Sequence, residues 1–363
     1  MNLEAKKHNQ RITTMYIVIA ILAFGIIIAV HELGHYLSAK ALNVKVNEFA
    51  IGMGPKLLKF QGKETFYSLR ALPFGGFCAM EGEHEESDEP DPRSFLSQKR
   101  WRRITILVAG SVANFFAAFI IIFILTAGAQ GFISTTISEV TDRFPDEGPS
   151  EIMAGDRIVS LNGERLFYHD DFALLVRLNA DKPITLLIER DGEIVEYERR
   201  TYIVDGTEQF RYILNFHPIE GTLWETLKYS VYQTYSFTRM IRISIAMLIS
   251  GAAGMQDVAG PVGIVSAMSE IGQQSPTTIA AIGNIAFFTA FIGVNVAVIN
   301  LLPIPAMDGG RILFIFITWV IEKITRKRLD PKYESYINTG AFVLLIGLMV
   351  VILYNDVTRL IHG

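Results

Sequence analysis

Four long apolar runs dominate the pattern of hydrophobic and polar positions along the chain. They lie at residues 15–30, 104–130, 283 to about 320, and 338–354. Each approaches or exceeds the roughly 20 residues that a helix needs to cross about 30 Å of hydrocarbon. No small-residue cleavage site follows the first run, so we expect a retained span rather than a signal peptide. The pattern predicts an α-helical polytopic membrane protein with about four transmembrane helices.

The segment from Tyr229 to Ser250 is a weaker candidate for a span. Arg239 and Arg242 lie near its middle, and an arginine at the centre of a transmembrane helix costs about 2.5–3.5 kcal/mol on insertion scales. We therefore expect an amphipathic helix that lies in the membrane interface. A fifth span is the alternative.

Basic residues indicate the orientation of the chain. Lysines and arginines are dense from Lys45 to Arg103, between the first two runs, and from Lys323 to Arg328, between the last two. With four spans these segments lie on one side, which the positive-inside rule makes cytoplasmic. Both termini then lie outside the cytoplasm, although three basic residues before the first run argue weakly for the opposite orientation.

Hydropathy falls between residues 131 and 218, where turn signals replace the apolar runs. An Asp-Gly pair at 191–192 separates two apolar-rich stretches and predicts a β-hairpin. Residues 169–178 have the pattern of a short helix with Asp170 or Asp171 near its start. Upstream, AGDRIVSLNGERL predicts a strand followed by an Asn-Gly turn. We expect a small β-rich domain inserted between the second and third spans.

Composition adds two exclusions to this picture. The net charge of −4 gives no indication of nucleic-acid binding. The single cysteine, Cys78, excludes an intrachain disulfide framework and a zinc site built mainly from thiolates. The mean hydropathy of +0.31 agrees with a membrane protein.

The sequence HELGH at residues 31–35 is the main chemical signal. Residues four apart share one face of a helix, so His31 and His35 can present two imidazoles to one metal ion. Glu32 lies about 100° around the helix, where it can reach a water at the metal without binding the metal itself. The alternatives are a chance match and a buried core histidine. A core histidine would explain one imidazole, but not two at metal-binding spacing with a glutamate between them. We predict a zinc site with Glu32 as the general base.

Asp308 is the strongest candidate for a third ligand because it lies inside an apolar run, in NLLPIPAMDGGRILF, whereas the other histidines lie outside the predicted spans. Pro303 and Pro305 prevent a regular helix just before it, so we expect a broken span. Counting 1.5 Å per residue along the spans places both His31 and Asp308 in the cytoplasmic half of the membrane. Asp308 can also act as the N-cap of a helix that starts near Gly309, with or without a metal.

Several stretches together resemble the site-2 proteases, a family of intramembrane zinc metalloproteases, and in particular the bacterial branch represented by RseP and RasP. They are HELGH on a first span, FAIGMGPKL at 49–57, LPFGGFCAMEGE at 72–83, GPVGI at 260–264 and NLLPIPAMDGG near the end. The stretch EGPSEIMAGDRIVSLNGERL at 147–166 resembles the PDZ domains of bacterial envelope proteases, with one such domain where enterobacterial relatives have two. One departure is Gly110-Ser111, where many relatives have Gly-Pro.

The resemblance implies roles for individual residues. The zinc (Zn²⁺) ligands would be His31, His35 and Asp308, with Glu32 as the general base. Asn300 and Pro303 match the motif NxxPxxxxDG, which lies beside the substrate in this family. Gly52 and Gly54 belong to a membrane-dipping β segment near the active site and are implied as substrate-binding residues. That segment could add an unwound substrate strand to its edge, and Asn300 could hold the opened backbone by its amide.

The resemblance also implies a biological setting in the bacterial cell membrane. Family members cleave transmembrane segments of single-pass membrane proteins, such as anti-sigma factors and remnant signal peptides, after a site-1 protease has trimmed the outer part. The expected partners are therefore such substrates and the lipid bilayer, and no nucleic acid. Two other functions stay open: a catalytically inactive PDZ-bearing membrane adaptor, which has no need of the ionisable set, and a metal transporter, which would place polar residues along a path.

The expected organisation has four parts. Residues 1–130 form a first membrane half with the HELGH helix and the cytoplasmic-side β segment, and residues 131–218 form an extracytoplasmic PDZ-like domain. Residues 219–282 form an amphipathic interfacial linker. Residues 283–363 form a second membrane half that carries the NxxPxxxxDG motif and the last span.

Overall fold

The computed structural model describes residues 3–83, 91–141, 152–179, 183–199, 202–204, 207–209, 213–254, 258–326 and 332–362. Residues 147–151 of the PDZ-like stretch, and Lys327 and Arg328 of the second basic segment, lie outside these ranges. The chain forms two compact units, which we describe separately. The first comprises Met1–Ile122 and Phe237–Gly363, and the second comprises Phe123–Ser236.

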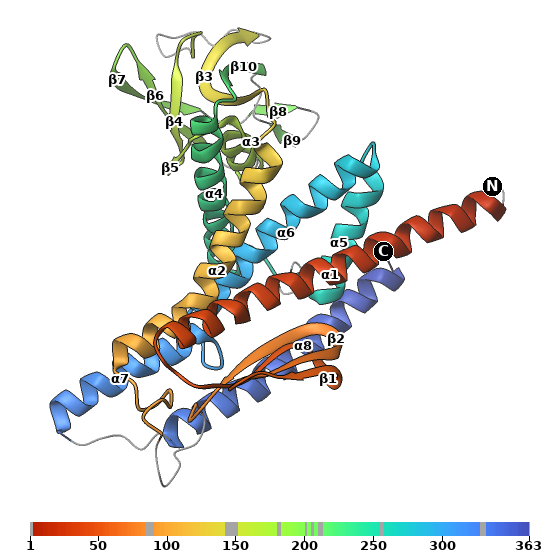
Figure 1. The fold of residues 1–363 in the computed structure, drawn as a ribbon. Coiled ribbons are helices and arrows are strands. Elements are labelled where there is room, and N and C mark those ends of the chain that lie inside the picture. Colours follow the sequence, from red (N-terminus) through yellow and green to blue (C-terminus); the bar gives the residue numbers. More distant parts are fainter. Residues whose placement is uncertain are drawn as a thin grey trace. The chain divides into compact units, whose positions relative to one another are not determined.

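The first unit is mainly helical (Figure 1). Its helices are α1 (Leu3–Ala41), α2 (Arg100–Thr126), α5 (Pro261–Gln274), α6 (Thr278–Leu301), α7 (Asp308–Thr325), α8 (Lys332–His362) and the second half of α4 (Leu223–Ser250). Within the described residues four segments are long and apolar enough to cross a membrane: Thr14–Ala41, Arg100–Thr126, Thr278–Leu301 and Thr339–Thr358. The predicted number of spans is therefore confirmed for the described part of the chain, and α4 is not among them.

The third span differs from the predicted bounds of 283 to about 320. Helix α6 ends at Leu301, and α7 begins only at Asp308, after an irregular segment. Pro303 and Pro305 in that segment cannot donate backbone hydrogen bonds and clash with a preceding helical turn. The predicted break is thus confirmed, but the N-cap position belongs to Met307. The prediction that Asp308 caps this helix is wrong, because Asp308 is already its first helical residue.

Helix α5 contacts three spans of the first unit, α1, α6 and α8. Tyr16 of α1 and Met268 of α5 are both buried in one cluster with Ile285 of α6. At the other end of α5, the Asp356 carboxylate of α8 accepts hydrogen bonds from the backbone N–H groups of Gly260 (3.1 Å) and Gly263 (2.9 Å). A buried carboxylate that receives two amide hydrogens at a helix N-terminus is well compensated. The GPVGI stretch is therefore a structural joint between α5 and α8.

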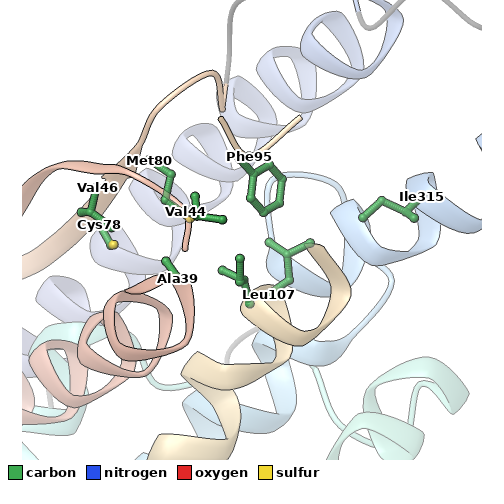
Figure 2. Packing of buried hydrophobic residues seen from close by; sticks show 9 residues of the cluster. Ala39, Val44, Val46, Cys78, Met80, Phe95, Leu107 and Ile315 are labelled. Atoms are coloured by element: carbon green, nitrogen blue, oxygen red, sulfur yellow. The ribbon is translucent and has the colours of Figure 1, made fainter. Parts of the chain in front are cut away.

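The segment between the first two spans is a folded-back antiparallel pair, β1 (Val46–Gln61) and β2 (Phe66–Met80), which lies alongside α1 (Figure 1). Residues 49–51 of β1 pair with residues 76–78 of β2 and also with residues 67–69. Figure 2 shows how Val46 and Cys78 of this pair join Ala39, Phe95, Leu107 and Ile315 in a buried cluster. The predicted β segment is confirmed, and burial of these side chains fixes it to the helices that flank it.

The described part of the second unit contains antiparallel strands, helix α3 and the first half of α4. The strands are β3 (Gly131–Thr141), β4 (Arg157–Leu161), β5 (Glu164–Arg165), β6 (Ile184–Arg190), β7 (Glu193–Arg199) and β10 (Ile213–Glu220), with a separate pair β8 (Tyr202–Val204) and β9 (Thr207–Gln209). The main sheet has the order β10-β3-β4-β6-β7, with β5 paired to β4. Asp191 and Gly192 have φ of 51° and 85° between β6 and β7, as the predicted hairpin turn requires.

Helix α3 (His169–Leu178) confirms the predicted short helix, and it is joined to the first half of α4 by polar contacts. The Tyr168 hydroxyl donates to Glu225 at 2.7 Å, and the Tyr229 hydroxyl donates to Asp170 at 2.7 Å. The Ser236 hydroxyl adds a 2.6 Å hydrogen bond to Asp171. This half of α4 is therefore part of the β-rich unit. Whether the rest of α4 lies in the membrane interface stays a prediction.

Candidate metal centre

The HELGH motif occupies the last part of α1, where the helix passes very close to α2. A Cβ atom added to Gly34 would lie 2.3 Å from the carbonyl oxygen of Ala109. Only glycine permits this approach, because any side chain would displace the α2 backbone. The close crossing brings His31 and His35, both buried, against α2.

Three side-chain donor atoms converge at this crossing. Nε2 of His31 lies 3.1 Å from Nε2 of His35 and 3.1 Å from Oδ2 of Asp308. Nε2 of His35 lies 3.2 Å from the same Asp308 oxygen. His31 and Asp308 are 277 positions apart in the sequence. The structure thus brings together the three residues that the sequence suggested as a ligand set.

The arrangement fits a zinc ion. Two imidazole nitrogens and one carboxylate oxygen are the donor types of many catalytic zinc sites, which keep a fourth position open. Ligand atoms about 2.0–2.1 Å from a tetrahedral ion lie roughly 3.3 Å from one another. The three observed separations are close to that value. Among the described residues, His31, His35 and Asp308 form a group whose donor atoms all lie within 4.8 Å of one another. The residues that would hold the metal are therefore already in place.

Helix α2 orients the second imidazole. The Nδ1 atom of His35 lies 2.8 Å from the carbonyl oxygen of Ile106 and donates its hydrogen there. That hydrogen bond leaves Nε2 without a proton and free to bind a metal, a common arrangement around zinc-bound histidines. Gly110, one helical turn further, makes room for the rings: a Cβ atom there would lie 2.4 Å from Nε2 of His35. The Gly-Ser departure at residues 110–111 keeps the glycine that this packing needs.

A cavity of about 560 Å³ opens next to the three donor atoms. Glu32 and Asn300 both line it, and the Asn300 amide nitrogen lies 3.4 Å from Nε2 of His31. Glu32 therefore lies beside the three candidate ligands without being one of them, as its place on the helix predicts. Pro303 is not among the lining residues; it contributes by breaking the backbone ahead of Asp308.

The β segment reaches the cavity through a different strand from the one predicted. Residues 77–80 of β2 all line the cavity. Successive side chains of a strand point to opposite faces, so four consecutive lining residues mean that the backbone edge of the strand borders the cavity. Within the described residues, β1 is the pairing partner of residues 76–80, on one side only. The edge available for strand addition is therefore in β2.

Strand addition was predicted at residues 49–57. Residues 49–51 of that stretch have no free edge, because they are paired on both sides. Gly52 and Gly54 do not line the cavity. Both have positive φ, 86° and 83°, and a Cβ atom at Gly52 would lie 2.5 Å from the Leu72 carbonyl oxygen. These glycines allow β1 to bend so that the sheet can fold back, which places residues 76–80 beside the site.

Two charged residues at the cavity were not singled out as site residues from the sequence. Arg311 of α7 forms an ion pair with Glu83, just after β2, and both line the cavity. Glu83 also accepts a hydrogen bond from the backbone nitrogen of Met80 at 3.1 Å. Their polarity inside apolar or glycine-rich stretches was the available signal. The pair fastens the end of β2 to the helix that begins with Asp308.

Comparisons with known proteins agree with this geometry. The family model described as peptidase family M50 matches residues 19–348. A protein of Clostridium acetobutylicum named "Putative zinc metalloprotease" is 36% identical over 345 residues, covering 94% of this chain and 97% of the relative. One of the same description from Fusobacterium nucleatum is 32% identical over 355 residues, covering 96% and 100%. The zinc metalloprotease RasP of Bacillus licheniformis is 26% identical over 423 residues, covering 94% and 98%.

Proposed function

We propose that this chain, which belongs to peptidase family M50 and is a multi-pass membrane zinc metalloendopeptidase, hydrolyses peptide bonds within transmembrane segments of other membrane proteins. The observation that carries the proposal is the shared cavity. Three zinc-type donor atoms, a neighbouring glutamate and the backbone edge of a β strand all border the same 560 Å³ space. A protease that cuts membrane spans needs each of these.

His31, His35 and Asp308 hold the zinc ion in this proposal. When bound, zinc supplies Lewis-acid polarisation of the scissile carbonyl and lowers the pKa of a water molecule to about 7. Glu32, which lines the same cavity, takes the proton from the attacking water on its carboxylate. The same carboxyl group then gives the proton to the leaving amine nitrogen, so the residue ends the cycle ionised again.

The β2 edge prepares the substrate. A helical substrate hides its carbonyl groups in the i to i−4 hydrogen-bond ladder and must be unwound locally before attack. Residues 77–80 border the cavity with their backbone edge, so an unwound segment can pair there as an added strand. Asn300, 3.4 Å from His31, holds the opened backbone through its amide. Gly52 and Gly54 act indirectly by shaping the sheet.

The orientation and the second unit complete the proposal. The basic residues between the spans support an orientation with the metal centre toward the cytoplasm of a bacterium and both termini outside. The β-rich unit is then an extracytoplasmic PDZ-like domain; the turn residues Asn162 and Gly163 after β4, and helix α3, support that reading. The substrates are single-pass proteins, such as anti-sigma factors or remnant signal peptides, already trimmed by a site-1 protease.

The decisive test replaces the proposed base while keeping the ligands. Glu32→Gln should retain zinc at the wild-type content but lose cleavage of a co-expressed single-pass substrate, because an amide cannot accept the proton. Glu139→Gln makes the same chemical change at an exposed position of β3 and should cleave normally. Wild-type cleavage rates in Glu32→Gln would show that Glu32 is not the base. A zinc-loaded wild type that binds substrates without cutting them would favour the adaptor instead.

A further inference from the structure

A second groove, of about 450 Å³, lies between the start of α2 and the second half of α7. Its apolar walls come from Ile104 on α2 and from Ile315, Phe316 and Trp319 on α7. Lys99, Arg100 and Trp101 border it where α2 begins. Neither the metal centre nor the proposed cleavage mechanism uses this groove.

The groove lies at the end of a candidate membrane span, the position at which lipid headgroups meet hydrocarbon. The transmembrane segment of α2 starts at Arg100, so the groove is at one end of a span. Trp101, Phe316 and Trp319 remain 55%, 51% and 43% exposed. Tryptophan is enriched at membrane–water interfaces because its ring is apolar and its N–H is polar. An open apolar groove with two such rings suits an acyl chain better than water.

The charge beside the groove is positive. Lys99 borders it directly, and the Lys323 ammonium lies 5.4 Å from the centre of the Trp319 ring. Arg100 forms an ion pair with Glu322, which links α2 to α7 and balances that one acidic group. Lys99 and Lys323 therefore leave a surplus of positive charge over an apolar groove. The complementary ligand is an anion attached to a hydrocarbon tail.

We propose that this groove binds one anionic phospholipid. Its phosphate lies between the Lys99 and Lys323 ammonium groups, and an acyl chain lies along Ile104, Phe316 and Trp319. Basic pockets between transmembrane helices are a recurrent mode of binding for anionic headgroups, and lysine serves there as a point charge for phosphate.

A bound lipid also contacts both α2 and α7, two helices that position the metal centre. Ile315 lines the groove and belongs to the buried cluster that contains Leu107 (Figure 2) and Ile106. The Ile106 carbonyl accepts the hydrogen bond that orients His35, and α7 begins with Asp308. A lipid that holds α2 and α7 together therefore stabilises the folded protein through two helices of the site.

The test measures binding to the purified full-length protein in detergent, by native mass spectrometry, with three probes. They are dioctanoyl phosphatidylglycerol, dioctanoyl phosphatidylcholine and glycerol phosphate. Each basic residue near an anionic lipid contributes about 1 kcal/mol, so the double variant Lys99→Gln/Lys323→Gln should bind phosphatidylglycerol about 30-fold more weakly. Lys59→Gln/Lys63→Gln, which removes two exposed lysines of the β1–β2 segment, should bind like the wild type.

Several outcomes would overturn the proposal. Equal affinity for phosphatidylcholine would mean an apolar crevice without charge selection, and tight binding of glycerol phosphate alone would mean a site for a free anion. Unchanged phosphatidylglycerol binding in Lys99→Gln/Lys323→Gln would show that these lysines do not bind the lipid phosphate. If that variant is poorly folded, Lys99→Arg/Lys323→Arg keeps the charge and should bind within about threefold of the wild type; a 30-fold loss there would also contradict the assignment.

Discussion

Two aspartates, Asp156 in the β-rich unit and the partly buried Asp308 in the membrane unit, have different kinds of polar partner. Asp156 in the β-rich unit, with its side chain 2% exposed, accepts hydrogen bonds from Arg190 at 2.7 and 2.8 Å and from the backbone nitrogen of Met153 at 2.7 Å. Asp308 in the membrane unit contacts only the two imidazoles among its described polar partners. An arginine carries a permanent charge, whereas a histidine that binds a metal does so as a neutral imidazole.

The difference separates a carboxylate with a structural role from the one that we propose as a metal ligand. The charge of Asp156 is compensated within the chain, so this group needs nothing further to remain buried. When both imidazoles are in the neutral form that binds a metal, a bound cation compensates the charge of Asp308. A partly buried carboxylate whose described polar partners are imidazoles is a candidate metal ligand. Substitutions of the two aspartates and of the residues around them test this distinction.

The largest effect is expected from the histidines that complete the site. His31→Ala or His35→Ala leaves two of three protein ligands, so zinc affinity should fall more than about 100-fold, beyond the loss typical of groups that only support a ligand. The zinc content of the purified variants, measured by mass spectrometry at zinc concentrations set by a buffer, tests this expectation. His217→Ala, at an exposed position of β10, is the matched control. Full zinc content in both site variants would remove the ligand assignment.

Asp308 itself should show a graded response. Asp308→Ala removes the carboxylate and should weaken zinc binding about 10- to 100-fold and abolish cleavage. Asp308→Asn keeps an oxygen of similar position without the charge, so it should fold normally and bind zinc more tightly than Asp308→Ala. Because Met307 occupies the N-cap, loss of a cap cannot account for such a result. Normal zinc binding and cleavage in Asp308→Ala would leave Asp308 without a role at the metal.

The metal centre was largely predictable from the sequence because its signals are local. The four-residue spacing of His31 and His35 follows from helix geometry alone, and an aspartate inside an apolar, proline-broken run stands out without any knowledge of the fold. The four spans follow from length and hydropathy for the same reason. The predicted end of the third span was wrong because the apolar character of the sequence continues through residues 302–307, where proline ends the helix.

The neighbours of the metal were not predictable in the same way. The edge strand at residues 76–80 depends on how β1 folds back on β2, and a strand pattern does not state its pairing. The contribution of Ile106 is a backbone carbonyl, which leaves no trace in residue type. The pairing of Arg311 with Glu83 joins residues 228 positions apart. In the second unit, short strands and the Asp-Gly and Asn-Gly turns were visible, while the docking of α4 was not.

A smaller effect, confined to the other unit, is expected for Asp156. Asp156→Ala leaves the Arg190 guanidinium without its main partner, and because that side chain is 26% exposed, we expect a loss of about 2–3 kcal/mol, less than for a fully buried pair. Limited proteolysis of the full chain should show faster cleavage within Phe123–Ser236, while zinc content stays at the wild-type level. Arg157→Ala, which breaks only the exposed ion pair with Glu189, should cost less than about 1 kcal/mol. A loss of zinc in Asp156→Ala would contradict the separation drawn between the two aspartates.

The smallest effect on chemistry is expected from removing most of the β-rich unit. Ile133 of β3 and Pro218 of β10 are register partners, so a short flexible joint can replace residues 134–218 without moving the ends of the neighbouring helices. The deletion removes Tyr168 and Phe167, which pack on Tyr229 and Tyr232 of α4. Tyr229→Ser and Tyr232→Ser should therefore be added to keep the shortened protein soluble.

If this unit acts as a size filter, the deletion leaves zinc binding and cleavage of a trimmed substrate within about twofold of the wild type, because no residue of the metal centre lies in it. The same protein should begin to cut an untrimmed version of that substrate, since a filter excludes bulk rather than lowering the barrier to hydrolysis. The alternative is capture, in which a newly exposed C-terminus adds to the edge strand β10 beside α3, where Phe216 packs on Phe172. Capture predicts the reverse pattern: cleavage of the trimmed substrate falls, with a raised KM and little change in kcat, in a deletion that still binds zinc.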